Sequence, residues 1–385
     1  MKRFFLYAKY AVIASVITLG FNACSDDDDD VDDDTQKEET LTAVVKQYVD
    51  NAVIVTYKSL ADETITLYNA LVKLKADKTN ANVNAVSASW IKTRDYWELS
   101  EAWLYGPASD FGIDDHIDTW PSDIDAISTL LKNSSDIQRM SQADGDVWIS
   151  GKEPGLLGFH GIEYVIYEEG KPKDVTKITD NELIYAVAVA GDLRNKCFQL
   201  EAAWVGLDNV TAEKRTKLEA IKADLKIENT NYYYGEAMKT PGLTGTWKSA
   251  TDACETIIEG CKDIADEVGA LKIGNPYTGE DVNYIESPYS YNSKVDFIGN
   301  IESIRNAYMG GVAGKRGASI SAYIKIINPG LDKEVQDAIN NAVEKIDAIP
   351  FPFAKNFTSN QAKEAMEACL DLDDILTKVQ TALRQ

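Results

Sequence analysis

Apolar residues recur at intervals of three and four along most of the chain, which is the spacing of one face of an α-helix. The pattern is clearest between Leu41 and Leu74, and no long run of alternating apolar and polar residues interrupts the rest. Ser287-Pro288 has the form of an N-cap and first helical residue, so a helix to Tyr308 is predicted there. The sequence therefore predicts an all-α fold. The remaining predicted helices cover residues 82–105, 121–131, 154–167, 182–204, 211–226, 246–271, 332–348 and 359–383.

The chain beyond residue 40 is too long for one small hydrophobic core, so two domains are predicted, each a bundle of the four-helix type. Gly170-Lys171-Pro172 is a strong break in the helical pattern. We therefore expect an N-terminal bundle over residues 40–170 and a C-terminal bundle over residues 171–385, with a cleft between them.

The first residues have the form of a signal peptide. Lys2, Arg3 and Lys9 precede an apolar stretch that is too short to span a bilayer comfortably and ends in small residues just before Cys24. This order predicts removal of residues 1–23 and lipidation of Cys24, which would anchor the protein to a membrane. The alternative is an ordinary signal peptide followed by a chance cysteine.

An acidic segment follows Cys24 over residues 24–39, with eight aspartates between positions 26 and 34. So many like charges cannot pack or pair, which predicts a solvated, disordered tether. The segment also resembles the acidic signal that directs Bacteroidetes lipoproteins to the cell surface. That resemblance implies the outer membrane, with its outer face as a further expectation. A simple spacer is the alternative, and calcium binding is disfavoured because no EF-hand spacing follows.

The formal net charge of −23 argues against nucleic acid as a partner and favours attraction of cations. Beyond Cys24 there are four cysteines, and none belongs to a CxxC pair. Buried free thiols and a bridge between Cys197 and Cys369 both fit the sequence, whereas Cys254 and Cys261 are too far apart along one helix to form a disulfide.

Only two histidines occur, His116 and His160, and the chain has no HExxH, GxSxG or nucleotide-binding glycine motif. His160 and Glu163 are one helical turn apart, so they could ligate one metal ion together or form a structural hydrogen bond at a helix crossing. Gly158 and Gly161 beside them would let a backbone or ligand approach closely. His116 is expected to be a solvated loop residue.

The segment Gly158-Phe159-His160-Gly161-Ile162-Glu163 is similar to the GxHxxE motif of the imelysin-like family, which is filed as a peptidase family and is related to EfeO-type iron-uptake proteins. Further blocks around Arg94, residues 101–107, 117–121, 148–155, 286–293 and 296–300 also resemble the family, so the resemblance extends from about residue 40 to the end. It implies two helical bundles with the motif in the cleft, an envelope location and a link to iron acquisition.

Two stripes of polar residues in these blocks follow helical spacing. One holds Arg94, Glu98 and Glu101, and the other holds Ser293, Asp296 and Asn300. Because unpaired polar burial costs a few kcal/mol per group, these side chains should face one another or a cleft. A structural network that locks the two domains, with Arg94 paired to Glu101 or Asp296, and a ligand site are both consistent with the stripes.

Three classes of function follow. The favoured one is a lipoprotein that binds a metal ion, iron or another divalent cation, or an iron-related small ligand for uptake, with a protein partner in the uptake system as a further expectation. Its expected ligands are His160, Glu163, Asp296 and Glu101. A metallopeptidase is the second class, although one motif histidine provides few ligands for a catalytic metal. A surface module for haem, protein or glycan is the third, suggested by the abundant tyrosines.

Overall fold

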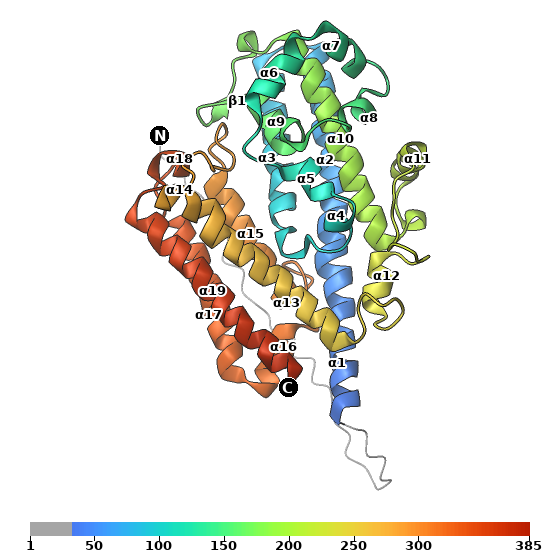
Figure 1. Cartoon of the computed structure of the whole chain (residues 1–385), viewed down its shortest axis with the longest axis vertical. Helices are drawn as coiled ribbons and strands as arrows, with labels where there is room; N and C mark the ends of the chain where they lie inside the picture. The colour runs from blue at the N-terminus through green and yellow to red at the C-terminus, as the bar shows by residue number, and fades with distance from the viewer. Residues whose placement is uncertain (1–32) are drawn as a thin grey trace.

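Helices make up nearly all the regular structure of the computed structural model, which describes residues 33–385 (Figure 1). In this part of the chain β1 (Tyr167–Glu168) and β2 (Lys171–Pro172) form one short antiparallel hairpin. The predicted all-α fold is confirmed. The predicted signal peptide, Cys24 and most of the acidic tether lie outside the described residues. Residues 33–39, expected to be disordered, are helical. Among the described helices, none combines the length and apolar character needed to cross a membrane.

Three long helices form the centre of a first helical group: α2 (Ile54–Ala76), α3 (Asn80–Glu98) and α10 (Asp180–Val205). α2 packs against both of the others. Its core-facing side includes Leu60 and Leu67, which are completely buried, and each such leucine contributes roughly 1.5–3 kcal/mol by leaving water. These helices are the rigid support on which the candidate site is built.

Short helices connect α3 to α10 and cover one side of this group. Among them, α5 (Ile113–Asp118) and α9 (Gly158–Ile166) contact each other and α10. α9 carries the GxHxxE motif, so this packing fixes the position of the motif within the group. The other segments of this connection are η2 (Glu101–Trp103), α4 (Pro107–Asp110), α6 (Ile124–Lys132), α7 (Ser134–Met140), α8 (Gly145–Ile149), η3 (Pro154–Leu156) and η4 (Val175–Lys177).

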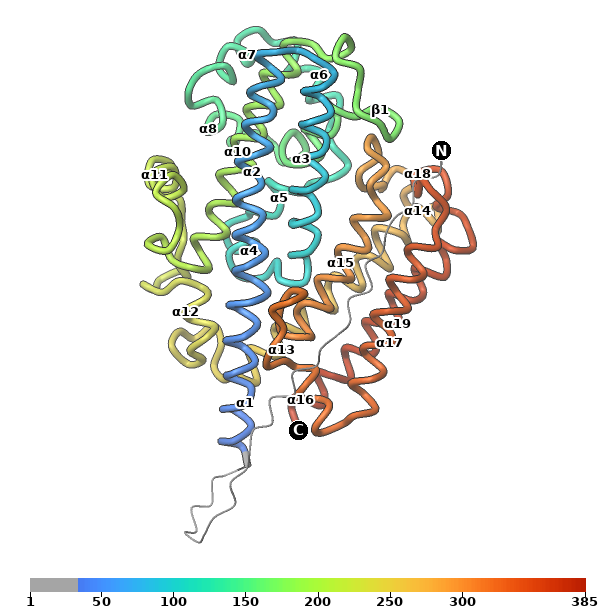
Figure 2. The backbone as a smooth tube through the Cα atoms, turned by 180° about the vertical axis from the view of Figure 1, so that it is seen from behind, coloured from blue at the N-terminus to red at the C-terminus, as the bar shows by residue number. Residues whose placement is uncertain are grey.

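A second helical group contains α13 (Ala250–Asp266), α15 (Ser293–Tyr308), α17 (Pro329–Asp347) and α19 (Asn360–Arg384), which pack as neighbours (Figure 2). Its shorter elements are η6 (Glu267–Ile273), α14 (Gly274–Thr278), α16 (Ile320–Ile327) and α18 (Phe353–Asn356). The chain passes from the first group to the second through η5 (Leu207–Asn209), α11 (Ala212–Ile221) and α12 (Tyr234–Lys239).

The two groups meet where α3 and η2 contact α15. Gly299 on α15 makes this approach close, because a Cβ atom there would lie 2.6 Å from Cβ of Glu98. A second connection is α1 (Asp33–Tyr48), which packs against α13 and continues through the π-helical segment η1 (Val49–Val53) into α2. One side of this junction holds the polar residues of the candidate site.

Two predicted helix boundaries are wrong at this junction. The helix expected over residues 82–105 ends at Glu98. Beyond it the chain forms η2, and the N–H of Ala102 donates to Oγ of Ser303 at 3.0 Å instead of to a helical carbonyl. The helix expected from Ser287 begins at Ser293, because Ser287 adopts a left-handed φ of 50° that no helix can contain.

The polypeptide around the predicted domain boundary at residue 170 forms the β1–β2 hairpin. α10, which follows it, packs on α2, α8 and α9 of the first group. The division into domains at this residue stays a prediction. All four described cysteines, Cys197, Cys254, Cys261 and Cys369, are free and buried, which is the first of the two alternatives left open for them.

Candidate metal centre

Arg94 lies at the centre of the buried polar residues between the two groups. Its side chain is completely buried and its guanidinium contacts carboxylates from both groups. Nε lies 2.5 Å from Oε1 of Glu98 and 3.8 Å from Oδ1 of Asp296, Nη2 lies 2.5 Å from Oε1 of Glu286, and Nη1 contacts Oδ1 of Asp118. A buried guanidinium is tolerated only when anions surround it in this way. Although burial opposes the charged form, these carboxylates raise the pKa of Arg94.

His160 joins the motif to this cluster through both of its ring nitrogens. Nε2 lies 3.0 Å from Oδ1 of Asp118, and Nδ1 lies 3.0 Å from Oε2 of Glu163. Burial opposes protonation, but these two carboxylates raise the pKa of His160 to about 9. At neutral pH the ring is therefore an imidazolium that donates to both acids, and in this arrangement neither nitrogen offers a lone pair to a metal ion.

Glu163 has both carboxylate oxygens engaged as well. Oε1 accepts hydrogen bonds from the backbone N–H groups of Tyr289 and Ser290, at 3.0 and 2.7 Å, and from Oγ of Ser290 at 2.7 Å. Glu163 thus holds the loop before α15 against α9. The structure places this predicted metal ligand in a contact between the two helical groups.

The two motif glycines allow the close packing that brings Asp118 to His160. Gly158 has a φ of +66°, and a Cβ atom there would lie 2.1 Å from the carbonyl oxygen of Ile117. A Cβ atom at Gly161 would lie 2.5 Å from the hydroxyl of Tyr185 on α10. A backbone and a side chain of the protein therefore occupy the space that these glycines leave.

The second predicted polar stripe lies on the face of α15 that meets α3. Nδ2 of Asn300 donates to Oε2 of Glu98 at 2.5 Å, and Oγ of Ser293 donates to the carbonyl oxygen of Glu286 at 2.5 Å. Asp296 accepts hydrogen bonds from Ser287 and Asn292, at 2.6 and 2.5 Å, in addition to its contact with Arg94. Contacts between the stripes join Asn300 to Glu98 and Asp296 to Arg94, which is one of the two arrangements left open for them.

Glu101 differs from these groups because it has no hydrogen bond or ion pair among the described residues, although only 5% of it is exposed. It lines a pocket of about 270 Å³ between the two groups, which we call the carboxylate pocket. Burial raises the pKa of Glu101 well above its usual value, although the charge of Lys272 opposes this shift. The main side chains of the carboxylate pocket are Glu101, Asp114, Asp118, Trp120, Glu267 and Tyr284.

Three acids could hold one cation here, of which Glu101 and Asp118 line the pocket and Glu98 lies beside them. Glu98, Glu101 and Asp118 each offer an oxygen, and these oxygens lie within 4.8 Å of one another. Asp118, His160 and Glu286 form a second group within the same limit. Burial raises the pKa of Glu98, whereas the charges of Arg94 and His160 overcome burial and lower the pKa of Asp118. The first group suits a cation that prefers oxygen ligands, since all three donors are carboxylates.

Three residues of the site were missed by sequence reasoning: Asp118, Glu286 and Lys272. Asp118 and Glu286 lie in blocks that carry the family resemblance, so a signal for them was available. Lys272 lies outside those blocks. The prediction for His116 was wrong: it lies in helix α5, its Nδ1 is 3.2 Å from Oδ2 of Asp192, and its side chain is 19% exposed.

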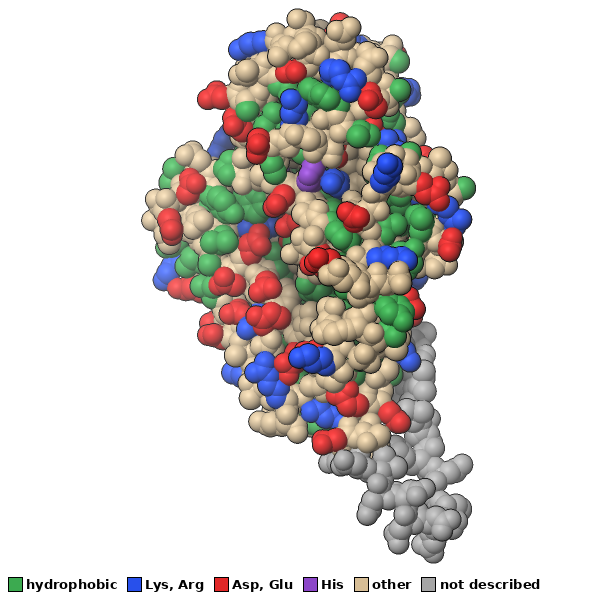
Figure 3. Space-filling model, turned by 45° about the vertical axis from the view of Figure 1, so that its right-hand side comes forward, with side chains coloured by type: hydrophobic (Ala, Val, Ile, Leu, Met, Phe, Trp, Pro, Cys, Tyr) green, Lys and Arg blue, Asp and Glu red, His purple; other side chains and the backbone are tan. Residues whose placement is uncertain are grey.

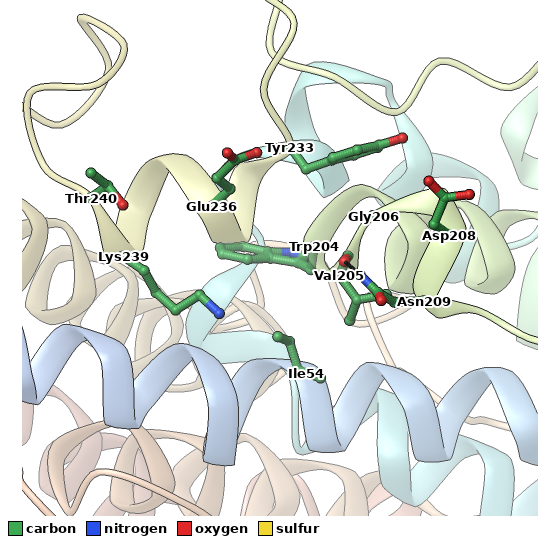
Figure 4. A pocket seen from close by; sticks show the side chains of 10 residues that line it. All are labelled: Ile54, Trp204, Val205, Gly206, Asp208, Asn209, Tyr233, Glu236, Lys239 and Thr240. Atoms are coloured by element: carbon green, nitrogen blue, oxygen red, sulfur yellow. Dashed lines mark hydrogen bonds between the residues drawn. The ribbon is translucent and has the colours of Figure 1, made fainter.

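Another hollow, of about 550 Å³, lies beside α12 (Figure 4). Trp204 and Tyr233 line it, and Nζ of Lys239 in its wall donates to Oδ1 of Asp50 at 2.8 Å. None of the predicted site residues lines this hollow, and its lining includes aromatic as well as acidic side chains. On the face drawn in Figure 3, acidic side chains gather over the left-hand half, which suits attraction of cations.

The chain resembles proteins that share this architecture. A family model for imelysin matches residues 53–379. Iron-regulated protein A of Synechococcus elongatus is 25% identical over 323 residues, which is 84% of this chain and 80% of that protein. A solved structure of an iron-regulated protein A precursor from Parabacteroides distasonis is 28% identical, with a TM-score of 0.76 over 89% of this chain and 95% of that one. An imelysin-like protein from Psychrobacter arcticum, 12% identical, shares the fold with a TM-score of 0.61 over 88% and 93% of the two chains.

Proposed function

The chain belongs to the imelysin family, and from this premise we propose that it is a cell-envelope protein that binds a metal cation, iron in the first place, in the carboxylate pocket. The observation that carries the proposal is Glu101, a residue only 5% exposed that lines the pocket and has no hydrogen bond or ion pair within residues 33–385. Such a group is costly to bury and gains a partner when a cation binds. Glu98 and Asp118 supply two further oxygens within reach of the same ion.

Iron is favoured by two considerations. A ferric ion is a hard acid that prefers oxygen ligands, and the three carboxylates provide only oxygen. The names of two similar proteins connect them with regulation by iron. His160 and Glu163, expected as ligands from the sequence, act in this proposal as the support that orients Asp118.

The proposed site lacks the free general base that a metallopeptidase would need at His160 or Glu163. A catalytic metal needs an open coordination position and a nearby base that can take a proton. His160 is doubly hydrogen-bonded and Glu163 is bound by backbone N–H groups, so neither is free for that task. A haem or glycan partner gains no specific support from this pocket, which is small and acidic.

The location of the protein is part of the same proposal. Lipidation at Cys24 and an acidic tether would display the folded body at the outer membrane, where it would meet cations before they enter the cell. Labelling of cells with a radioactive fatty acid tests this part. We expect label in the full chain and none in Cys24→Ala, and equal labelling of the two proteins would contradict the anchor.

Cation binding is tested by titrating the folded protein with ferric citrate in a calorimeter. We expect Glu101→Gln, which keeps the shape of the side chain, to weaken binding at least about tenfold. Glu201→Gln is the matched control, because Glu201 is also buried but pairs with Lys214 far from the pocket. Equal affinity of Glu101→Gln and the wild-type protein would contradict the proposal.

A further inference from the structure

Lys272 places a positive charge at the inner wall of the carboxylate pocket. Its side chain is completely buried. Nζ donates to Oε1 of Glu286 at 3.1 Å and lies 3.7 Å from Oε1 of Glu267, which lines the pocket. The same ammonium lies 4.9 Å from the centre of the Trp120 ring, another part of the pocket wall.

The local backbone explains how Lys272 and Glu267 come to face the same side. α13 changes at Glu267 into the π-helical segment η6, which carries both Glu267 and Lys272. A π-helix forms i→i+5 hydrogen bonds, so residues five apart lie nearly above each other. The acid and the ammonium thus face the same side, whereas an α-helix would turn them apart. Such segments are frequent at functional sites.

Lys272 differs from the two other cationic groups of the site. Arg94 contacts acids with each of its three nitrogens, and His160 with both of its nitrogens. These two groups belong to the framework that holds the acids. Lys272 makes a single hydrogen bond, and its charge is the strongest favourable one acting on Glu101, Glu267 and Glu286. Arg94 contacts two of the proposed ligands, Glu98 and Asp118, whereas Lys272 is the cation on the Glu101 and Glu267 side of the pocket.

We propose that Lys272 sets the affinity and the charge preference of the cation site by repelling the bound ion. This inference rests on the proposed function. Coulomb repulsion grows in proportion to the charge of the ion, so the ammonium disfavours a trivalent ion more than a divalent one. Because the lysine stem is buried, the ammonium cannot withdraw into solvent when the ion arrives.

The test measures binding of two redox-inert probe ions, Ga³⁺ as its citrate and Mn²⁺, to wild type and variants. Lys272→Met removes the charge and keeps most of the side-chain length, whereas Lys272→Arg keeps the charge. We expect Lys272→Met to bind both ions at least about tenfold more tightly. The gain for Ga³⁺ should be about one and a half times that for Mn²⁺ on a logarithmic scale.

Two controls accompany this comparison. Lys272→Arg should stay within about threefold of the wild type because it keeps the charge. Lys214→Met is the matched buried lysine, since Lys214 is also completely buried but pairs with Glu201 and Asp62 away from the pocket. It should leave both affinities unchanged.

Weaker or unchanged binding by Lys272→Met would overturn the proposal, because it would make Lys272 a residue that holds the carboxylates in place. Equal gains in affinity for Ga³⁺ and Mn²⁺ would show that Lys272 does not set the charge preference of the site. Lys272→Gln is a second neutral variant, and failure of both neutral variants to fold would likewise count against the proposal. If the wild type binds neither ion, the proposed function itself fails, which is a different result.

Discussion

Nε2 of His160 lies 3.0 Å from Oδ1 of Asp118, so the motif histidine is bonded to an acid that precedes it by 42 positions. The same Asp118 contacts the guanidinium of Arg94 and accepts from Nε1 of Trp97 at 2.8 Å. Three donors on two helices, α3 and α9, therefore fix one carboxylate, and that carboxylate is a proposed metal ligand. The histidine acts on the pocket through Asp118.

Replacement of His160 by glutamine should destabilise the protein by about 3 kcal/mol, because Asp118 and Glu163 lose a buried cationic partner. Urea denaturation measures the loss. His116→Gln is the control: it also removes a histidine–aspartate contact, but at a partly exposed site, and should cost less than about 1 kcal/mol. Similar losses of stability in the two variants would show that the buried contacts of His160 stabilise the protein no more than the partly exposed contact of His116.

Glu101→Gln should have the opposite effect on the metal-free protein. Removing an acid that is buried without a partner should raise the free energy of unfolding by about 1 kcal/mol, even though the same change weakens cation binding. Denaturation in the presence of a chelator provides the measurement. A loss of stability would instead identify Glu101 as part of the structural network around Arg94.

Gly158→Ala tests the close approach of α9 to α5. The new Cβ would meet the carbonyl oxygen of Ile117 at 2.1 Å, so we expect a loss of about 3 kcal/mol or more. Gly112 provides a control for backbone strain alone, since it also has a positive φ but a Cβ there would touch nothing within 4 Å. Gly112→Ala should cost about 1 kcal/mol. Thermal unfolding of the two variants separates strain from collision.

Asp146, which lies away from the carboxylate pocket, should make the stability of the first group depend on pH. Although burial opposes it, the ammonium of Lys217 at 2.5 Å and the amide of Asn195 at 3.0 Å lower the pKa of Asp146. A lowered pKa in the folded state means that the stabilisation is present above the unfolded-state pKa, near about 4, and is lost as the pH falls.

Asp146→Asn should therefore be less stable than the wild type at neutral pH, by about 1 kcal/mol, and the difference should shrink as the pH falls below about 4. Urea denaturation over this pH range measures both proteins. A difference that stays constant with pH would mean that packing at this position, and not the charge of Asp146, accounts for the stability.

Periodicity predicted the polar side chains that share one helix. The pair His160–Glu163 and the stripe from Ser293 to Asn300 follow directly from spacings of three, four and seven, whereas Arg94 was expected to pair with Glu101 or Asp296 and its short contact on α3 is with Glu98. Facing stripes were expected because buried polar groups need partners, and the contact of Asn300 with Glu98 fulfils that expectation. This part of the site depends on which side chains share one face of a helix, and residue spacing alone predicts that.

The remaining part depends on contacts between distant segments and on unusual backbone. Asp118 reaches His160 because Gly158 lets α5 approach, and Glu286 lies in a loop whose neighbour Ser287 has a left-handed φ. A period of 3.6 does place Lys272 on the buried face, seven residues after Ala265, but it turns Lys272 away from Glu267, and the π-helical segment brings these two side chains to the same side. Spacing alone therefore could not assemble the acids and the lysine of the carboxylate pocket.

The run from α1 through η1 to α2 belongs to both halves of the molecule, since α1 packs on α13 while α2 packs on α3 and α10. The carbonyl of Asn51 within η1 also accepts from the N–H of Val312 in the second half, at 2.9 Å. Helices bend most readily at π-segments. A bend of this run is therefore expected at Val49–Val53, the five residues that join the part packed on α13 to the part packed on α3 and α10.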